Sequence, residues 1–336
     1  MTYRLSRDTL FNPCKHYVST WSDFEPILTS CRCRAIQVGD NKKANRMKAS
    51  ISVVIPIYNG KRFLHEAVAS VAGQTLMPTE VILIDDGSQD DPFVVLDNEY
   101  PFPVIRKKQA NAGQSSARNA GAALATGDYL AFLDQDDRWY PEHLERLIRP
   151  FSPRTGWVYS NLDLMNEDGS TKQKRHLDLA GGPHPKRQTI DFLKSDMHVL
   201  PSASLVRKTA FESVGGFDVQ LSGFEDDDLF RRMHEHGWGN EYVDVSLSAW
   251  RIHKSSCGFS PRMAKSRDIY EAKLLSKYPE YTDAIKPRFT NGRCNEKLKT
   301  SRIGQFLWPA RYIVPRRVRH VIRHLITKMR AYGVAV

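Results

Sequence analysis

The sequence predicts an α/β fold in which a mostly parallel sheet is flanked by helices. Two β-branched runs, residues 51–56 and 81–84, are too short for helices and too apolar to face water, which is typical of buried parallel strands. Between them, apolar side chains recur at helical spacing from Phe63 to Val71, so the three segments form a β-α-β unit. The same pattern then repeats, with a strand at 104–106, a helix at 113–124 and a strand at 129–133.

The second half of this region is predicted from shorter signals. We expect a strand at residues 200–206, a helix at 208–214 and a strand at 247–252. A further helix begins at Glu225, because Leu229, Phe230 and Met233 follow at helical spacing.

Polar clusters stand where several of these strands should end. They are residues 85–88 (Asp-Asp-Gly-Ser), 134–137 (Asp-Gln-Asp-Asp), 225–228 (Glu-Asp-Asp-Asp) and the later His253. The carboxyl ends of strands in an open α/β sheet form its usual ligand edge. The sequence therefore gathers carboxylates at one edge, as a protein does to hold a divalent metal and a nucleotide diphosphate.

Each cluster taken alone has a simpler interpretation. Residues 85–88 suit a solvated turn, since Gly87 allows a tight bend. Residues 134–137 could be an acidic loop or a helix cap before Pro141, although three carboxylates beside a buried strand are electrostatically costly unless a cation shares the site. Residues 225–228 could merely complement a helix dipole, and His253 could be a satisfied core residue.

The order and spacing of the motifs between residues 51 and 254 resemble the family 2 glycosyltransferases. The resemblance rests on V-V-I-P-I-Y-N at 53–59, D-D-G-S at 85–88, N-A-G-Q-S-S-A-R-N-A-G at 111–121 and L-D-Q-D-D at 133–137, followed by G-G-F-D at 215–218, E-D-D-D-L-F-R-R at 225–232 and R-I-H at 251–253. It implies a glycosyltransferase A-type, Rossmann-like fold and an inverting, nucleotide-sugar-dependent enzyme.

The resemblance also implies roles for individual residues. Tyr58 is expected against the nucleotide base, Asp86 at its ring nitrogen and Asp134 near the ribose. The metal would bind Asp136 and His253, and Asp226 would be the general base. The full expected nucleotide-sugar set is Pro56, Tyr58, Asn59, Asp85, Asp86, Asn111, Arg118, Asp134 and Glu225.

The chemistry of sugar transfer calls for these residue types. A departing nucleoside diphosphate gains negative charge, which Mg²⁺ or Mn²⁺ neutralises. An acceptor hydroxyl is a poor nucleophile at neutral pH, and a carboxylate that takes its proton contributes typically about 10² to 10⁴ in rate. We therefore expect transfer from a nucleotide-sugar, with UDP-sugars favoured, to a glycan or lipid-linked acceptor in bacterial-type cell-surface glycan assembly.

Two other functions use parts of the same pattern. A nucleotidyltransferase also employs metal-binding carboxylates, but it should carry a Gly-rich triphosphate loop after its first strand, and residues 56–60 (Pro-Ile-Tyr-Asn-Gly) are not one. A non-catalytic carbohydrate-binding relative should have lost acidic motifs, whereas all of them are intact here.

Charge divides the chain into three parts. Its hydrophobic content of 41%, without low-complexity tracts, indicates a globular protein. The net charge of +11 is concentrated at the ends, since residues 1–50 carry 9 Lys or Arg against 4 acids and residues 301–336 carry 8 against none. The middle is thus slightly acidic, and we expect no nucleic-acid partner for it.

The C-terminal region, residues 281–336, is predicted to be basic and helical. Its apolar stripe is formed by Val318, Val321, Ile322, Leu325, Ile326 and Met329, with Arg and Lys around it. Such a helix is typical of proteins that lie on an anionic membrane. The alternative is a helix docked on the catalytic domain or on a second subunit.

The remaining regions set the domain boundaries. We expect a catalytic domain at residues 48–280 and an N-terminal extension at 1–47 that is loosely attached, or absent if translation starts at Met47; an extra helix near residues 17–27 is the alternative. The 5 scattered cysteines form no disulfide or zinc framework, and no secretory signal is recognisable. These features predict a cytoplasmic protein, peripheral on the inner membrane face if the tail binds lipid.

Overall fold

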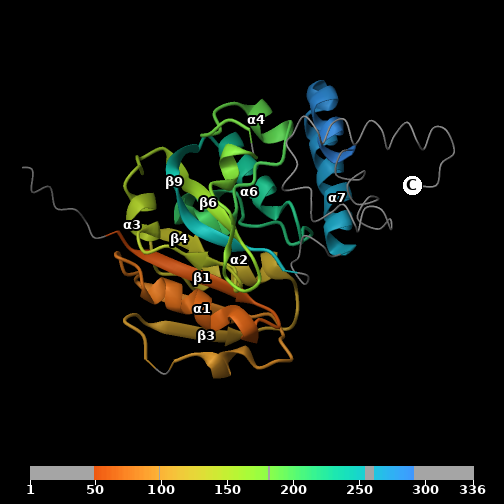
Figure 1. Cartoon of the computed structure of the whole chain (residues 1–336). Helices are drawn as coiled ribbons and strands as arrows, with labels where there is room; N and C mark the ends of the chain where they lie inside the picture. Colours follow the sequence, from red (N-terminus) through yellow and green to blue (C-terminus); the bar gives the residue numbers. More distant parts are fainter. Residues whose placement is uncertain (1–48, 98, 181, 254–260, 291–336) are drawn as a thin grey trace, which may run out of the picture. The chain divides into compact units, whose positions relative to one another are not determined.

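A computed structural model describes residues 49–97, 99–180, 182–253 and 261–290, all of which belong to the compact unit that begins at Met47. In this part of the chain, nine strands form one sheet in the order β3-β2-β1-β4-β8-β6-β9-β5, and β7 pairs with β6 (Figure 1). The predicted α/β architecture is confirmed.

The first half of the sheet is parallel, as the sequence predicts. Its strands are β1 (Ile51–Ile57), β2 (Glu80–Asp85), β3 (Val104–Lys108) and β4 (Tyr129–Phe132). Every residue of β1 and β2 is buried, because helices cover both faces of the sheet. The two β-α-β units place the carboxyl ends of β1, β2 and β4 at one edge.

The second half is mixed. β8 (Ser204–Arg207) runs antiparallel to β4 and to β6 (Thr155–Met165), and β9 (Gly239–Arg251) runs parallel to β6. The short strands β5 (Arg138–Trp139) and β7 (Thr171–Gln173) pair with β9 and β6. The predicted strand at 200–206 starts instead as the turn η3 (Pro201–Ala203), because Pro201 fixes a helical φ there.

Two helical layers cover the sheet. On one face, α1 (Lys61–Ala72) and α3 (His143–Ile148) pack through Leu64 and Leu144 against Val53. On the other face, the core includes Ala117 and Phe230. The helices on that side are α2 (Gln114–Leu124), α4 (Thr189–Leu193), α5 (Lys208–Ser213) and α6 (Glu225–Glu235), with the short turns η1 (Pro92–Val95), η2 (His176–Asp178) and η5 (Pro279–Tyr281) elsewhere in the chain.

A further hydrophobic cluster joins the end of the described chain to this domain. Tyr270 and Leu274, from α7 (Pro261–Lys277), pack with Ile285 and Phe289 of the helical segment 282–290 and with Leu221. The folded domain thus continues past residue 280. No helix in the described ranges is long and apolar enough to cross a membrane. The predicted extension at 1–47 and the helix at 318–329 lie outside the described residues.

Candidate active site

The loops after β1 and β4 are bound to each other at the carboxyl edge of the sheet. Tyr58 follows β1, and its backbone N–H donates to Gln135 Oε1 at 2.8 Å, while Gln135 Nε2 donates to the Tyr58 carbonyl at 3.0 Å. Gly60 leaves room for this bridge, because a Cβ at this position would lie 2.0 Å from Gln135 Oε1 and would displace the Gln135 side chain. The Tyr58 side chain stays 45% exposed above this bridge and is free to lie against a planar ligand.

The loop after β2 combines a turn with an anchor for the next helix. Asp85 is buried; its Oδ1 accepts from the Ser88 N–H at 2.8 Å, and Lys108 Nζ lies 3.5 Å from its Oδ2. Asn59 adopts a φ of 49° and its N–H donates to Ser88 Oγ at 2.9 Å. Pro56 lies one residue before the end of β1, opposite Ile84.

Asp86 holds the start of α2. Its Oδ1 accepts from Gln109 Nε2 and the Ala112 N–H, and its Oδ2 accepts from the Gly113 N–H, all at 2.8 Å. Asn111 adds a bond from its Nδ2 to the Asp86 carbonyl at 3.0 Å. The motif at 85–88 therefore forms a turn and also orders the loop at 111–113. The expected contact of Asp86 with a nucleotide base stays a prediction.

A buried arginine joins two of the acidic clusters. Arg118, in α2, is 1% exposed and donates to Asp134 Oδ1 at 2.6 Å and to Glu225 Oε1 at 2.8 Å. Burial alone would lower the pKa of Arg118, but the two carboxylates raise it above its ordinary value. The fork geometry of a guanidinium suits this double contact, which fixes the loop at 134–137 next to the beginning of α6.

Replacing Arg118 by Met should destabilise the protein strongly. The change would leave Asp134 and Glu225 without their cation, and breaking a buried ion pair costs about 3 to 5 kcal/mol. Urea unfolding followed by circular dichroism measures the loss. Arg62→Met is the control, since the exposed pair Arg62–Glu167 should contribute at most about 1 kcal/mol. Equal stability losses in the two variants would contradict this account of Arg118.

The expected metal ligands meet in the structure. Asp136 follows β4 and His253 follows β9, and His253 Nε2 lies 2.7 Å from Asp136 Oδ2. Arg251 holds them together, because its N–H donates to Asp137 Oδ1 at 3.0 Å and its Nε to the Asp136 carbonyl at 2.8 Å.

Asp136 and His253 fit a site that a substrate completes. Within the described ranges, no group of three or more His, Cys, Asp or Glu side chains is arranged to hold a metal. Mg²⁺ is usually bound by one or two carboxylates together with substrate phosphates, so one carboxylate and one imidazole suit a metal shared with a diphosphate.

Asp137 is a site residue that the sequence reasoning left without a role. It is 2% exposed, and its Oδ2 has no hydrogen-bond partner among the described residues. Burial and then the charges of Asp136 and Asp134 raise the pKa of Asp137 well above its ordinary value. Arg251, which binds Asp137, has no predicted role either, because its partners Asp136, Asp137, Glu167 and Glu66 are all more than 80 residues away in sequence.

The four acids that open α6 have different environments. Glu225 accepts from Arg118 and Gln114. Asp227 is paired with Arg288, and Asp228 with a cluster formed by Arg231, Arg232 and Lys273. Asp226 is half-buried and accepts only the neighbouring Asp227 N–H at 2.8 Å, so it is the one member of the four without an ion pair in the described structure.

The electrostatics of Asp226 suit a proton acceptor. Burial and then the charges of Asp227 and Glu225 raise the pKa of Asp226 well above its ordinary value. A carboxylate with a raised pKa is a stronger base than an ordinary one, and it is ionised only above that raised pKa.

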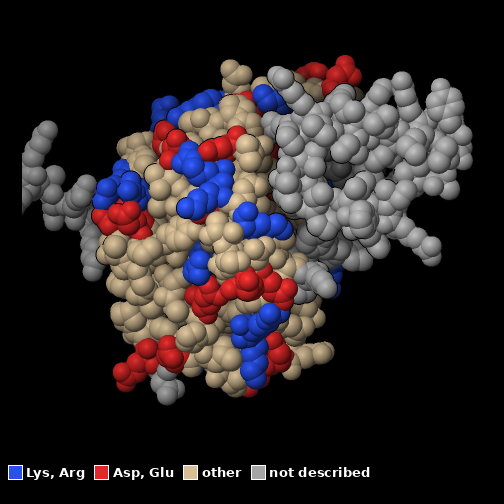
Figure 2. Space-filling model, viewed as in Figure 1, with Lys and Arg blue, Asp and Glu red and all other residues tan. Residues whose placement is uncertain are grey.

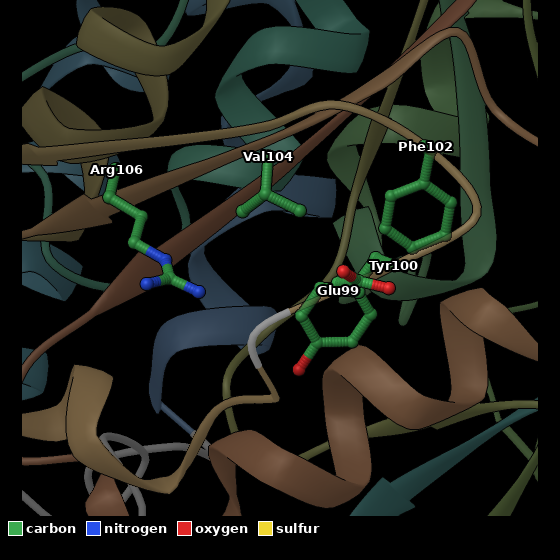
Figure 3. A pocket seen from close by; sticks show the side chains of 5 residues that line it. All are labelled: Glu99, Tyr100, Phe102, Val104 and Arg106. Atoms are coloured by element: carbon green, nitrogen blue, oxygen red, sulfur yellow. The ribbon is translucent and has the colours of Figure 1, made fainter.

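Two hollows in the described part of the molecule can be compared with the positions of the acidic clusters. One of about 530 Å³ lies beside the edge strand β3, where Figure 3 shows Glu99, Tyr100 and Arg106 along its wall. It lies beside none of the acidic clusters. A smaller hollow of about 310 Å³ borders Gly113, in the loop that Asp86 orders, and Lys265 of α7. The smaller one therefore belongs to the candidate site, although the other is larger.

The visible face of the described structure is neither uniformly basic nor uniformly acidic (Figure 2). Figure 2 shows clusters of Asp and Glu next to clusters of Lys and Arg over the described part of the visible face. This mixture agrees with the nearly balanced charge of the middle of the chain.

The α/β fold brings acidic loops together at one edge of the sheet, and comparison with known proteins identifies the family. The model of "Glycosyl transferase family 2" matches residues 52–215. The uncharacterized glycosyltransferase YwdF of Bacillus subtilis is 32% identical over 189 residues, which cover 54% of this chain and 67% of that protein. The chain belongs to glycosyltransferase family 2.

Two other relatives are covered to different extents, and the chain spans less than half of the first of them. The uncharacterized glycosyltransferase alr2836 of Nostoc is 41% identical over 141 residues, which cover 40% of this chain and 42% of the relative. An uncharacterized glycosyltransferase of Haemophilus influenzae is 29% identical over 209 residues, which cover 60% and 68% of the two chains.

Solved structures confirm the glycosyltransferase A-type fold. The mannosyltransferase PcManGT of Pyrobaculum calidifontis, in complex with GDP-Man and Mn²⁺, has a TM-score of 0.56 and 14% identity, covering 83% of this chain and 80% of its own. Residues 1–349 of S. aureus TarS, in complex with UDP-GlcNAc, have a TM-score of 0.51 and 17% identity, covering 67% and 66%. At these identities the likeness concerns the fold.

Proposed function

We propose that this enzyme transfers a sugar from a nucleotide-sugar to an acceptor hydroxyl with inversion, by metal-assisted direct displacement. The observation that carries the proposal is the position of Asp226, the unpaired carboxylate among four consecutive acids. Arg118 binds both Glu225, which precedes Asp226, and Asp134, which lies two residues before Asp136. The candidate base and the candidate metal ligand are therefore connected through one side chain.

The nucleotide would occupy the loops after β1 and β2. The exposed ring of Tyr58 supports a stacking role, and the hydrogen bonds of Asp86 order the loop at 111–113 beside the end of β2. We favour a UDP-sugar as donor. The complexes of the two structural neighbours, one with UDP-GlcNAc and one with GDP-Man, make both nucleotides the first candidates to test.

Asp136 and His253 would hold Mg²⁺ or Mn²⁺. When bound, such an ion supplies positive charge to the departing diphosphate. Mn²⁺ in the complex of the mannosyltransferase neighbour supports this assignment.

Asp226 would take the proton of the acceptor hydroxyl. As the acceptor oxygen bonds to the anomeric carbon, the bond to the diphosphate breaks and the hydroxyl proton passes to the Asp226 carboxylate. Because a base acts only when ionised, the raised pKa of Asp226 predicts a rate that falls on acidification at a pH well above the ordinary value for Asp.

Thermal shift with a panel of nucleotides tests this function. UDP-GlcNAc, UDP-glucose, GDP-mannose and UTP are each added with and without MnCl₂, and positive samples are assayed for release of nucleoside diphosphate. One nucleotide-sugar should raise Tm more with Mn²⁺, since a ligand at 100 times its Kd stabilises by about 2.7 kcal/mol. Stabilisation by UTP alone would favour a nucleotidyltransferase, and tight sugar-nucleotide binding without turnover would favour a non-catalytic relative.

We further propose a glycan or lipid-linked acceptor in bacterial-type cell-surface glycan assembly, reached from the cytoplasmic face of the membrane. The support is the basic amphipathic pattern at residues 318–329. Each Lys or Arg near an anionic surface contributes about 1 kcal/mol, so the tail could hold the enzyme on a bilayer reversibly.

Deleting the residues after Gln305 should abolish binding to anionic liposomes at low salt and slow transfer to a lipid-linked acceptor. Nucleotide binding and donor hydrolysis should persist, because the described domain ends before the deletion. Liposome co-sedimentation at two salt concentrations measures the first effect. A full-length protein that ignores anionic liposomes would reduce the tail to a packing element and remove the support for a lipid-linked acceptor.

A further inference from the structure

One arginine whose side chain is buried lies far beyond the segment that the family model matches. Arg288 belongs to the helical segment 282–290, and its side chain is 3% exposed. Its Nη2 donates to Asp227 Oδ2 and its Nη1 donates to the Phe192 carbonyl at 3.0 Å. One guanidinium thus joins the C-terminal helical segment to α4 and to the first turn of α6.

Arg288 contacts the residues on both sides of the pair Glu225–Asp226. Its guanidinium carbon lies 5.8 Å from the ring centroid of Phe224, and its Nη2 holds Asp227. Phe224 caps α6 with a φ of 63°, and its carbonyl accepts the first helical bond, from the Asp228 N–H at 3.0 Å. A non-glycine residue in this left-handed conformation needs support from its surroundings, and the Phe224 ring is held among Arg288, Tyr270 and Phe289.

Charge gives the same contact a second effect. The charged groups that act on Asp226 and Asp227 in the first turn of α6 include Glu225 within it and Arg288. The others are Asp196 and His198 from the segment after α4, and Lys186 from the segment before it. Burial raises the pKa of Asp227 to about 6, with the Arg288 charge opposing the rise. Arg288 therefore favours the ionised form of Asp227, whose charge raises the pKa of the neighbouring Asp226.

We propose that Arg288 is a positioning residue for Asp226, which fixes the first turn of α6 and pairs with Asp227 so that Asp226 is the carboxylate left to take the acceptor proton. This inference rests on the proposed function of Asp226. It makes the C-terminal helices, which lie beyond the residues matched by the family model, part of the catalytic unit.

The test compares Arg288→Gln and Arg288→Lys with Arg232→Gln. Arg232 is a matched control, because it also binds an acid of α6, Asp228, and the carbonyls of Val214 and Gly216. Donor Kd, kcat for nucleoside diphosphate release, the pH profile of kcat and Tm are measured with the best donor from the panel.

Arg288→Gln should keep donor Kd within about two-fold and lower kcat about 10- to 100-fold, since misplacing a catalytic group by about 1 Å can cost that much. The acid limb of its pH profile should move to lower pH, because Asp227 without its cation keeps its proton and no longer raises the pKa of Asp226. Arg288→Lys keeps the positive charge but loses the planar guanidinium that binds two partners at once. Its kcat should therefore fall, while the pH at which kcat declines on acidification should stay unchanged.

Arg232→Gln should lower Tm with unchanged kcat and acid limb. Wild-type kcat and acid limb in Arg288→Gln, or in Arg288→Lys if the first variant does not fold, would overturn the proposal, as would equal kcat losses in the Arg232 and Arg288 variants. A wild-type enzyme without donor turnover, or a fully active Asp226→Asn variant, would instead refute the proposed function itself.

Discussion

Asp226→Asn is expected to lower turnover by about 10² or more while leaving donor binding nearly intact. The amide has almost the same shape as the carboxylate but cannot take the acceptor proton. Since Asp226 has no ion pair in the described structure, its replacement should leave the fold undisturbed. Donor Kd by titration calorimetry and kcat for nucleoside diphosphate release measure the two effects separately.

Asp228→Asn is the matched comparison, because the same change two residues further along α6 should have the opposite consequence. Asp228 is fully buried and binds Arg231, Arg232 and Lys273, so its replacement should cost about 3 to 5 kcal/mol of stability. Burial alone would raise the pKa of Asp228, but these cations lower it below its ordinary value. The stabilisation that ionised Asp228 gives the fold is therefore fully present above the pKa of Asp228 in the unfolded chain. It is lost as the pH falls through the lower pKa that Asp228 has in the folded protein. Any Asp228→Asn protein that folds should keep its kcat.

For the Asp226→Asn variant, by contrast, retained turnover would contradict the assignment of Asp226 as the base.

Asp136→Ala is expected to weaken metal-dependent donor binding. Even outer-shell partners of a metal change its affinity about 10- to 100-fold, so loss of a direct ligand should cost at least as much. The variant should lose most of the additional Tm rise that Mn²⁺ gives with the donor. Asp168→Ala, which removes an exposed acid from a loop, is the control. Equal responses to Mn²⁺ in Asp136→Ala and the wild type would contradict the metal assignment.

The parallel half of the sheet was predictable because β1, β2 and β4 are nearly continuous apolar runs. β6 was missed, since Ser160, Asn161 and Asp163 interrupt its apolar pattern, although Asn161 is satisfied inside the fold by the N–H groups of Leu162 and Leu177. Only the last third of β9 was found, because its earlier residues are half exposed and polar. Buried polar residues and edge positions hide strands from pattern reasoning.

The sequence predicts the position of site residues that directly follow a strand. It does not predict ion pairs between residues that are far apart in the chain. The loops at 85–88 and 134–137 lie at the predicted sheet edge because parallel strands must end there. The pairing that distinguishes Asp226 depends on Arg118 and Arg288, which lie far from α6 in the sequence. A charge run shows neither which carboxylate has a cation nor which is left without one.

The stereochemistry of donor hydrolysis tests the central account most directly. The wild-type enzyme is incubated with Mn²⁺ and the α-linked donor that it turns over, and the first-formed sugar is followed by proton NMR before it mutarotates. Direct displacement assisted by Asp226 predicts that the β-anomer appears first, at a rate that Asp226→Asn lowers about 10² or more. First appearance of the α-anomer, or an equal rate in Asp226→Asn, would contradict it.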